Sequence, residues 1–374
     1  MQRRTGAIPR AAMQAEPLSP TLRRGWTTGA CAAAAAKAAA SALVGEAFPD
    51  PVTITLPQGQ TPAFALAMQE RGPDFARAGI IKDAGDDPDV THGVLVIARV
   101  WRALPGEGIV FHAGPGVGTV TRPGLPLAPG EPAINPVPRA MISKAIADIA
   151  GKAVDIHVEI AIPGGEALAL RTLNPRLGII GGLSVLGTTG IVVPYSCAAW
   201  IDSIHRGIDV ARASGLTHVA GATGSTSEAA IMQLHGLPDA ALIEMGDFVG
   251  GMLKYLRRHP LPRLSIAGGF GKMTKLGQGL LDLHSRRGEV DPLWLSARAA
   301  EAGASAGAVA AIKTANSALH ARALDDSGRL SAVVAERAWH TAADLLGATP
   351  CELEIAIFDR AGTLLATTGL KPLR

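Results

Sequence analysis

The sequence predicts a two-domain α/β protein, and three observations support this fold class. The chain has 374 residues, which is more than one ordinary hydrophobic core holds. Its first half is rich in strand patterns, whereas strand and helix patterns alternate in its second half, as in a parallel sheet with crossover helices. We expect a disordered tail over 1–20, a β-rich α+β domain over 21–170, and a Rossmann-like α/β domain with a mostly parallel sheet over 171–374.

An alanine-rich helix opens the predicted first domain. Alanine is the strongest helix former, and the alanine run begins directly after Thr27 and Thr28. Either threonine is a favoured N-cap, and Gly45 is a favoured stop. The strands that follow are predicted over 52–56, 63–69, 78–81, 93–100, 109–113 and 154–162, with a helix over 138–150 before the last of them.

Short apolar runs alternate with helical patterns in the predicted second domain. Strands are expected over 178–180, 218–221, 241–244, 264–267 and 351–358. Helices are expected over 197–214, 225–235 and 247–258, and helical patterns dominate 292–346. Parallel strands end at one edge of a sheet, and open α/β sheets bind their ligands at that edge.

The charge and cysteine content narrows the class of function. The formal net charge is only +3, and lysine and arginine are scattered, unlike the basic stripe of a nucleic-acid-binding protein. Cys31, Cys197 and Cys351 lie far apart, so the sequence predicts neither a disulfide framework nor a zinc site. Such cysteine usage fits a reducing cytoplasm.

Two segments are candidates for targeting or membrane insertion. The first twenty residues contain arginines but no apolar run, so they are not typical of a secretory signal. The segment 177–201 carries no charge, but it contains five glycines and Pro194, which are unfavourable in a lipid-facing helix. We expect a cytoplasmic protein without a membrane span, in which 177–201 forms a buried strand, a glycine-rich loop and the start of a helix.

The segment from Lys82 to Gly93 concentrates charged side chains between two predicted strands. Its charged and titratable residues are Lys82, Asp83, Asp86, Asp87, Asp89 and His92. Aspartate is favoured in turns, but four aspartates exceed the need of one turn, and loops on a rigid scaffold often carry chemistry. We select Asp83, Asp86, Asp87 and His92 as candidate catalytic residues; a solvated acidic turn is the alternative.

Three glycine-bearing loops follow predicted strands in the second half of the chain. Glycine lets the backbone approach a ligand closely, and the start of a following helix offers free N–H groups. None of the loops matches a dinucleotide fingerprint or a P-loop, so NAD and ATP are not supported. Ordinary tight turns are the alternative for each loop. The candidate cofactor-binding residues are Gly187, Thr188, Thr189, Gly190, Gly221, Thr223, Gly224, Ser225, Gly268 and Gly269.

Two acidic residues lie near the predicted sheet edge at which the parallel strands of the second domain end. Glu244 lies twenty residues beyond Gly224, which is about the separation at which Rossmann-like folds place the carboxylate that binds a ribose diol. Asp247 is the alternative for this role. Acidic residues at strand ends are common, so this spacing alone is weak support.

Two arginines precede the N-terminus of the alanine-rich helix. Arg23 and Arg24 lie just before Thr27 and Thr28, and a helix N-terminus favours negative charge. The sequence therefore predicts an anion site here; the alternative is that both arginines are merely solvated.

Eight segments carry long motifs of unusual composition. They are LRRGWTTGACAAAAAK at 22–37, IKDAGDDPDVTHG at 81–93, GPGVGT at 114–119, GEPAINPVPR at 130–139, PGGE at 163–166, NPRLG at 174–178, LGTTGI at 186–191 and GDFVG at 246–250. In this order they resemble the CbiD family, the cobalt-precorrin-5B (C-1)-methyltransferases of cobalamin biosynthesis. Trp26 and Ala30 depart from the Tyr and Thr expected there, and the Gly221–Ser227 loop is less typical of the family.

The resemblance implies transfer of a methyl group from S-adenosylmethionine to carbon 1 of a ring-contracted cobalt corrinoid. The displacement is in-line, so the protein mainly aligns donor and acceptor. The conjugated ring delocalises electrons, so a strong base is optional. A proton that leaves later would be taken by a candidate catalytic residue of the segment 82–93, which we call the acidic loop.

A corrinoid has many carboxylates on its rim, and we expect it in a cleft between the two domains. The expected substrate-binding residues are Arg23, Arg24, Thr27, Thr28, Lys82, Arg139, Asn174 and Arg176. Cations among them would pair with the carboxylates. The acidic loop would repel those carboxylates, so we expect it near the reacting centre or the sulfonium.

The residues leave other functions open. A methyltransferase that acts on a different tetrapyrrole or on a metal-free precorrin is one alternative, because the metal lies in the ring and needs no protein ligand. A corrinoid-binding carrier without catalysis is another, and it would bind no S-adenosylhomocysteine. A homo-oligomer is also left open.

Overall fold

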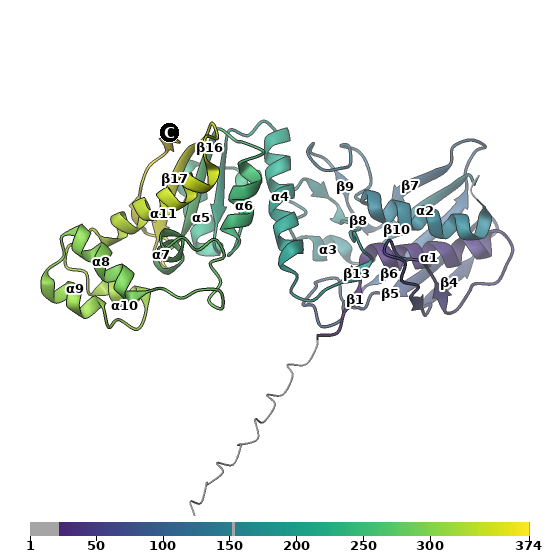
Figure 1. Ribbon diagram of the computed structural model, residues 1–374. Helices are drawn as coiled ribbons and strands as arrows, with labels where there is room; N and C mark the ends of the chain where they lie inside the picture. Colours follow the sequence, from purple (N-terminus) through teal and green to yellow (C-terminus); the bar gives the residue numbers. More distant parts are fainter. Residues whose placement is uncertain (1–21, 152–153, 374) are drawn as a thin grey trace, which may run out of the picture.

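The computed structural model describes residues 22–151 and 154–373, and the predicted tail over 1–20 lies outside the described residues. The mixed α/β class with two domains is confirmed (Figure 1). One hydrophobic core draws on residues between 30 and 185, and a second on residues between 204 and 357. Helix α4 (Cys197–Ala213) lies between the two halves in Figure 1.

A five-stranded sheet and two helices form the N-terminal half. The sheet has the order β4–β5–β6–β10–β7, in which only the β10–β7 pair is parallel. Its strands and helices are β4 (Met68–Arg71), β5 (Phe75–Ile81), β6 (Leu95–Arg102), β7 (Ile109–Ala113), β10 (Ile156–Ala161), α1 (Thr28–Leu43) and α2 (Pro136–Ala150). Helix α1 packs against α2, β5 and β6. Because most of its residues are alanine, its backbone approaches these neighbours closely on every side.

Short strand pairs close the N-terminal half. They are β1 (Gly25–Trp26) with β13 (Ile191–Val192), β8 (Gly116–Val117) with β12 (Gly182–Leu183), β9 (Thr119–Val120) with β11 (Ile179–Ile180), and β2 (Val52–Thr53) with β3 (Ala63–Phe64). Strands β11, β12 and β13 follow the expected boundary at 170–171, yet they pair with strands that precede it. The boundary itself stays a prediction.

A six-stranded mixed sheet forms the C-terminal half. Strands β15, β14, β16 and β17 are parallel neighbours in that order, and β18 and β19 pair with β17 in the antiparallel sense. The strands are β14 (His218–Ala222), β15 (Leu242–Glu244), β16 (Arg263–Gly269), β17 (Glu352–Phe358), β18 (Leu364–Thr367) and β19 (Lys371–Pro372). The helices are α5 (Ser225–His235), α6 (Val249–Leu256), α7 (Phe270–Gly277), α8 (Pro292–Ala302), α9 (Ala306–Ile312), α10 (Ala318–Ala323) and α11 (Leu330–Leu346).

Most predicted elements are present, but one strand and one helix differ from their predicted bounds, and two helices were not predicted. The strand predicted over 63–69 is wrong as one element, because the Leu66 N–H donates to the Asp50 carboxylate (3.1 Å) between β3 and β4. Helix α2 begins at Pro136, before the expected start, since proline is tolerated in a first helical turn. Helices α3 (Gly165–Ala169) and α7 were not predicted, because each begins directly after a glycine pattern that indicated a loop.

The uncharged segment 177–201 contains the predicted turns and the start of a helix, but the prediction of one buried strand is wrong: three two-residue strands form, and Ile180 is 55% exposed. It forms β11, β12, β13 and the start of α4, with glycine-bearing turns between them. Among the described residues, none of the helices has both the length and the apolar character that crossing a membrane requires.

Candidate functional site

Three segments that are distant in the sequence meet at one end of α1. They are residues 23–29, 82–93 and 186–195, which we call the loop cluster. Backbone hydrogen bonds join them: the Trp26 N–H donates to the Asp83 carbonyl (2.7 Å), the Thr27 N–H to the Gly190 carbonyl (3.0 Å), and the Gly29 N–H to the Leu186 carbonyl (2.9 Å). The predicted acidic loop, the arginine pair and one glycine loop therefore belong to one site.

Two glycines allow the closest approach within the loop cluster. A Cβ atom at Gly25 would lie 2.0 Å from the carbonyl carbon of Ala84, which no side chain tolerates. Gly85 has φ +68° and its added Cβ would lie 2.1 Å from the Arg23 carbonyl oxygen. The two backbone segments can therefore cross this closely only because each has glycine at the contact.

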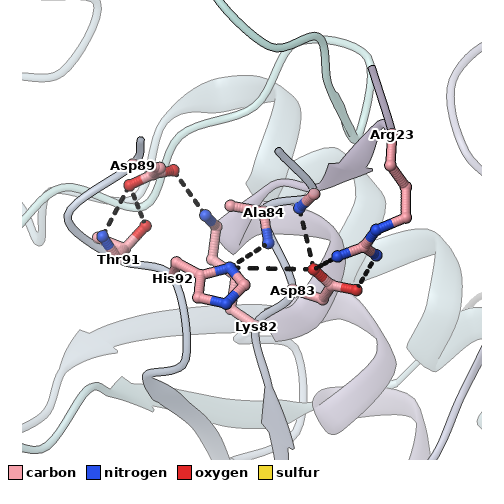
Figure 2. Close-up of polar contacts among 8 residues, drawn as sticks. Arg23, Lys82, Asp83, Ala84, Asp89, Thr91 and His92 are labelled. Carbon is pink, nitrogen blue, oxygen red and sulfur yellow. Dashed lines mark hydrogen bonds and ion pairs between the residues drawn. The ribbon is translucent and has the colours of Figure 1, made fainter. Parts of the chain in front are cut away.

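Lys82 is buried beneath the acidic loop. Its side chain is 1% exposed, and its ammonium donates to the Asp89 carboxylate (2.6 Å), as Figure 2 shows. Asp89 also accepts from the N–H and the hydroxyl of Thr91. Burial by itself would raise the pKa of Asp89, but the charge of Lys82 and these hydrogen bonds outweigh burial and lower it. Lys82 was expected at a substrate carboxylate, but in this structure its ammonium is held inside the loop.

Asp83 pairs with Arg23 at the surface of the loop. The guanidinium donates to both carboxylate oxygens (Figure 2). The Gly85 N–H donates to one of them. The hydrogen bond from Arg23, followed by that from Gly85, lowers the pKa of Asp83 to about 2. Such a carboxylate is a poor base, because protonation breaks its hydrogen bonds.

His92 is oriented by the backbone of the same loop. Its Nδ1 accepts a hydrogen bond from the Ala84 N–H (3.1 Å). The neutral ring therefore carries its proton on Nε2. In this arrangement Nε2 of the neutral ring is the nitrogen that can donate a hydrogen bond to a ligand.

Asp86 and Asp87 are the less engaged carboxylates of the loop. One oxygen of Asp86 accepts from the Arg23 N–H (2.6 Å), and one oxygen of Asp87 accepts from the Tyr195 N–H (2.8 Å). Within the described part of the chain, the second oxygen of each carboxylate makes no hydrogen bond. Of the four candidate catalytic residues, these two are the best placed to accept a proton.

The glycine loop over 187–190 belongs to the loop cluster and does not lie with the other two glycine loops. A Cβ at Gly187 would lie 2.2 Å from the Thr27 hydroxyl oxygen, and Gly187 has φ +133°. Thr27 itself caps α1 by accepting from the Ala30 N–H (3.2 Å). The Thr189 hydroxyl bonds to the backbone of Ile191.

The other two glycine loops meet at the C-terminal edge of β14, β15 and β16, which we call the strand-edge cluster (residues 221–225, 244–247 and 268–269). The Thr223 N–H donates to the Ala267 carbonyl (3.1 Å), and the Gly246 N–H to the Ala222 carbonyl (3.2 Å). A Cβ at Gly224 or Gly269 would meet no atom within 4 Å. The backbone at both glycines therefore faces open space that a ligand can occupy.

Charged side chains border the strand-edge cluster. Arg176 reaches it from the N-terminal half and pairs with the carboxylates of Glu244 and Glu228. Burial and then the nearby Glu244 charge raise the pKa of Glu228, although Arg176 opposes both effects. Asp247 pairs with Lys272. Arg176 thus joins the two halves at the sheet edge where we expect a protein carboxylate to bind a ribose.

The remaining predicted substrate-binding residues have mainly local partners. Asn174 is 6% exposed and its amide bonds to Gly182 and Ser184. Arg139 donates to the carbonyls of residues 132 and 134 and pairs with Glu131. Thr28 is buried in α1, and Arg24 forms an isolated bridge with Gly85 through its backbone.

Sequence reasoning missed Tyr195 and Trp200. Tyr195 donates its N–H to Asp87, and the Trp200 indole N–H donates to the Glu244 carbonyl (3.0 Å). These bonds link the loop cluster and the strand-edge cluster to the two ends of a six-residue stretch. No spacing in the sequence marks either residue, although both follow the glycine loop closely.

Fold and site define a two-domain α/β protein with an acidic loop held by hydrogen bonds and ion pairs, and with a glycine-lined sheet edge. Residues 15–194 match the family described as CbiD, and residues 282–369 match the family described as CbiD, C-terminal domain. The chain belongs to the CbiD family.

Relatives named cobalt-precorrin-5B C(1)-methyltransferase align over most of the chain. The protein from Paramagnetospirillum magneticum is 59% identical over 92% of this chain and 97% of its own length. The protein from Bradyrhizobium sp. is 62% identical over 94% of this chain and 95% of its own length. A crystal structure described as a cobalamin biosynthesis protein (cbiD) from Archaeoglobus fulgidus is 28% identical, covers 71% of this chain and 83% of its own, and superimposes with a TM-score of 0.39.

Removing the partner of Lys82 tests the role of the buried pair. Asp89→Asn leaves a buried ammonium without a countercharge, so we expect the free energy of unfolding to fall by about 3 kcal/mol. Urea unfolding followed by circular dichroism measures this change. Asp74→Asn, in the exposed turn between β4 and β5, is the matched control with little expected effect. Equal unfolding midpoints for the two variants would contradict the assignment.

The Arg23–Asp83 pair makes the free energy of unfolding depend on pH in the acid range, and the direction follows from the lowered pKa of Asp83. The pKa of Asp83 falls from 3.8 to about 2 on folding, so the stabilisation is complete above about pH 4 and is lost as the pH falls towards 2. Both side chains are substantially exposed, so the effect is small and is weakened by salt. Unfolding curves between pH 5 and 2 should therefore converge for wild type and Asp83→Asn. Parallel curves would refute the pairing in solution.

Proposed function

We propose that this chain transfers a methyl group from S-adenosylmethionine to carbon 1 of cobalt-precorrin-5B, giving cobalt-precorrin-6A in cobalamin biosynthesis. The observation that carries this proposal is the identity of about 60% with methyltransferases of that name over more than nine tenths of the chain. The two clusters supply what such a reaction needs, namely an anchored polar loop and an open backbone edge.

The strand-edge cluster is the proposed site of the methyl donor, on a C-terminal domain that functions as a Rossmann-like unit. Open space at Gly224 and Gly269 supports this assignment, as does the start of α5 directly after Gly224, since free N–H groups there suit a polar ligand. Glu244 and Asp247 are the acceptors proposed for the ribose hydroxyls. The 187–190 loop lies with the acidic loop, so we assign it to the corrinoid side.

The loop cluster is the proposed site of the corrinoid. Arg23 and Arg24 border it and suit rim carboxylates. The corrinoid carbon attacks the methyl group, the carbon–sulfur bond breaks, and neutral S-adenosylhomocysteine leaves. The protein contributes alignment of the two reactants, and Asp86 or Asp87 accepts the proton that the methylated ring releases. His92 donates a hydrogen bond and does not act as the base.

Filling the open space at Gly269 tests the donor site. Gly269→Leu adds a side chain whose Cβ would meet no atom within 4 Å outside its chain neighbours, so the fold should be retained while S-adenosylhomocysteine binding weakens at least about tenfold. Titration calorimetry measures the affinity, and Ala361→Leu in the exposed turn before β18 is the control. An unchanged affinity in Gly269→Leu would remove the donor from this edge. Absence of binding to the wild type would favour a corrinoid carrier.

Neutralising the two available carboxylates tests the proposed base. Asp86→Asn combined with Asp87→Asn keeps hydrogen-bond acceptors for Arg23 and Tyr195 but removes the basic groups, so kcat should fall about 100-fold. Methyl transfer from labelled donor measures kcat, with Asp74→Asn as the control. Unchanged turnover would exclude both carboxylates as the base. Equal kcat/KM for the metal-free counterpart of the substrate would favour the metal-free alternative.

A further inference from the structure

Tyr195 has an unusual backbone conformation at the border of the loop cluster. Its φ is +55°, and among the described residues it is the only non-glycine residue with positive φ. A bulky side chain disfavours this left-handed region, which persists only where the surroundings hold it. Here the Asp87 carboxylate holds the Tyr195 N–H at 2.8 Å.

Contacts of the Tyr195 ring with the rest of the chain do not compensate for the strained backbone conformation. The ring belongs to a residue that is 67% exposed, so packing of the ring does not offset the strain. Strain that is retained without a packing benefit is typical of ligand-binding positions. Tyr195 thus presents an aromatic side chain to the solvent while its backbone N–H is held by one of the two available carboxylates of the acidic loop.

Trp200 is a second exposed aromatic residue, and it lies against the strand-edge cluster. It lies in the first turn of α4, which Ser196 caps by accepting from the Ala199 N–H. Its indole N–H donates to the Glu244 carbonyl (3.0 Å), its ring lies 3.5 Å from a Cβ position at Gly246, and it is 47% exposed. A fixed indole with an exposed face can contact a planar ligand through its apolar surface.

Other large apolar side chains are exposed in the same stretch. Leu186 and Val193 are 49% and 48% exposed, and both flank the glycine loop of the loop cluster. An exposed apolar group between two polar clusters is typical of a surface that binds a ligand with an extended apolar face. The methyl donor is small and polar, whereas the corrinoid is broad and flat.

We propose that Tyr195 and Trp200 are positioning residues that pack against the face of the tetrapyrrole ring. This inference rests on the proposed function. Tyr195 sets the ring height above Asp86 and Asp87, and Trp200 directs the ring edge towards the donor at Glu244. The strained backbone at Tyr195 is retained because it points the side chain at the substrate.

A matched series at position 195 separates strain from ligand contact. Tyr195→Gly and Tyr195→Ala both remove the ring, but only glycine adopts φ +55° without strain. We expect a higher Tm for the glycine variant than for the alanine variant. We also expect both to raise KM for cobalt-precorrin-5B at least tenfold, with the affinity for S-adenosylhomocysteine unchanged. Tyr195→Phe should retain wild-type KM and Tm.

The outcomes distinguish this inference from the proposed function. Wild-type protein that transfers no methyl group to the corrinoid would overturn both. An active wild type with unchanged KM in Tyr195→Gly and Tyr195→Ala would overturn only the positioning role. A Tm for the glycine variant below that of the alanine variant would show that the backbone at 195 is not strained, which also overturns it. Trp200→Leu should raise KM in the same way, and a normal KM would remove Trp200 from the surface.

Discussion

The buried ammonium of Lys82 is the constraint on which the loop cluster depends. Removing a charge from water costs several kcal/mol unless a partner compensates it, and Asp89 is that partner at 2.6 Å. The backbone of Lys82 also closes the base of the loop, because its N–H donates to the Val94 carbonyl (2.9 Å) and its carbonyl accepts from Gly93 (2.8 Å). Residues 83–92 are therefore fixed at both ends and from below.

This fixed loop divides four aspartates into two pairs with different tasks. Asp89 and Asp83 are each bound to a cation, and the pKa of each is lowered. Asp86 and Asp87 receive one backbone N–H each and keep a second oxygen for which the described chain provides no donor. Negative charge that folding alone does not require thus remains at the surface of the loop, where a reacting ligand can use it.

Contacts between the two halves link the loop cluster and the strand-edge cluster. Arg176 carries positive charge from the N-terminal half to Glu244 at the sheet edge. The Tyr195 N–H donates to Asp87 of the acidic loop, and the Trp200 indole N–H donates to the backbone carbonyl of the same Glu244. A short stretch before and within α4 therefore contacts both clusters. This stretch therefore bridges the two sites that we propose for the acceptor and the donor.

The sequence alone determined the α/β class, most helices and strands, and the family. Alanine content predicts α1, apolar runs predict the parallel strands, and long motifs identify CbiD. These signals are local, and each is readable within about fifteen residues. The sequence also marked the acidic loop and all three glycine loops.

Only the tertiary structure decided which of these segments share a site and which side chains stay available. It placed the 187–190 loop beside Thr27 and apart from the other two glycine loops, buried Lys82, and engaged Asp83 with Arg23. It also gave Tyr195 its left-handed backbone. These outcomes depend on hydrogen bonds and ion pairs between residues far apart in the chain, and residue spacing carries no information about such long-range pairing.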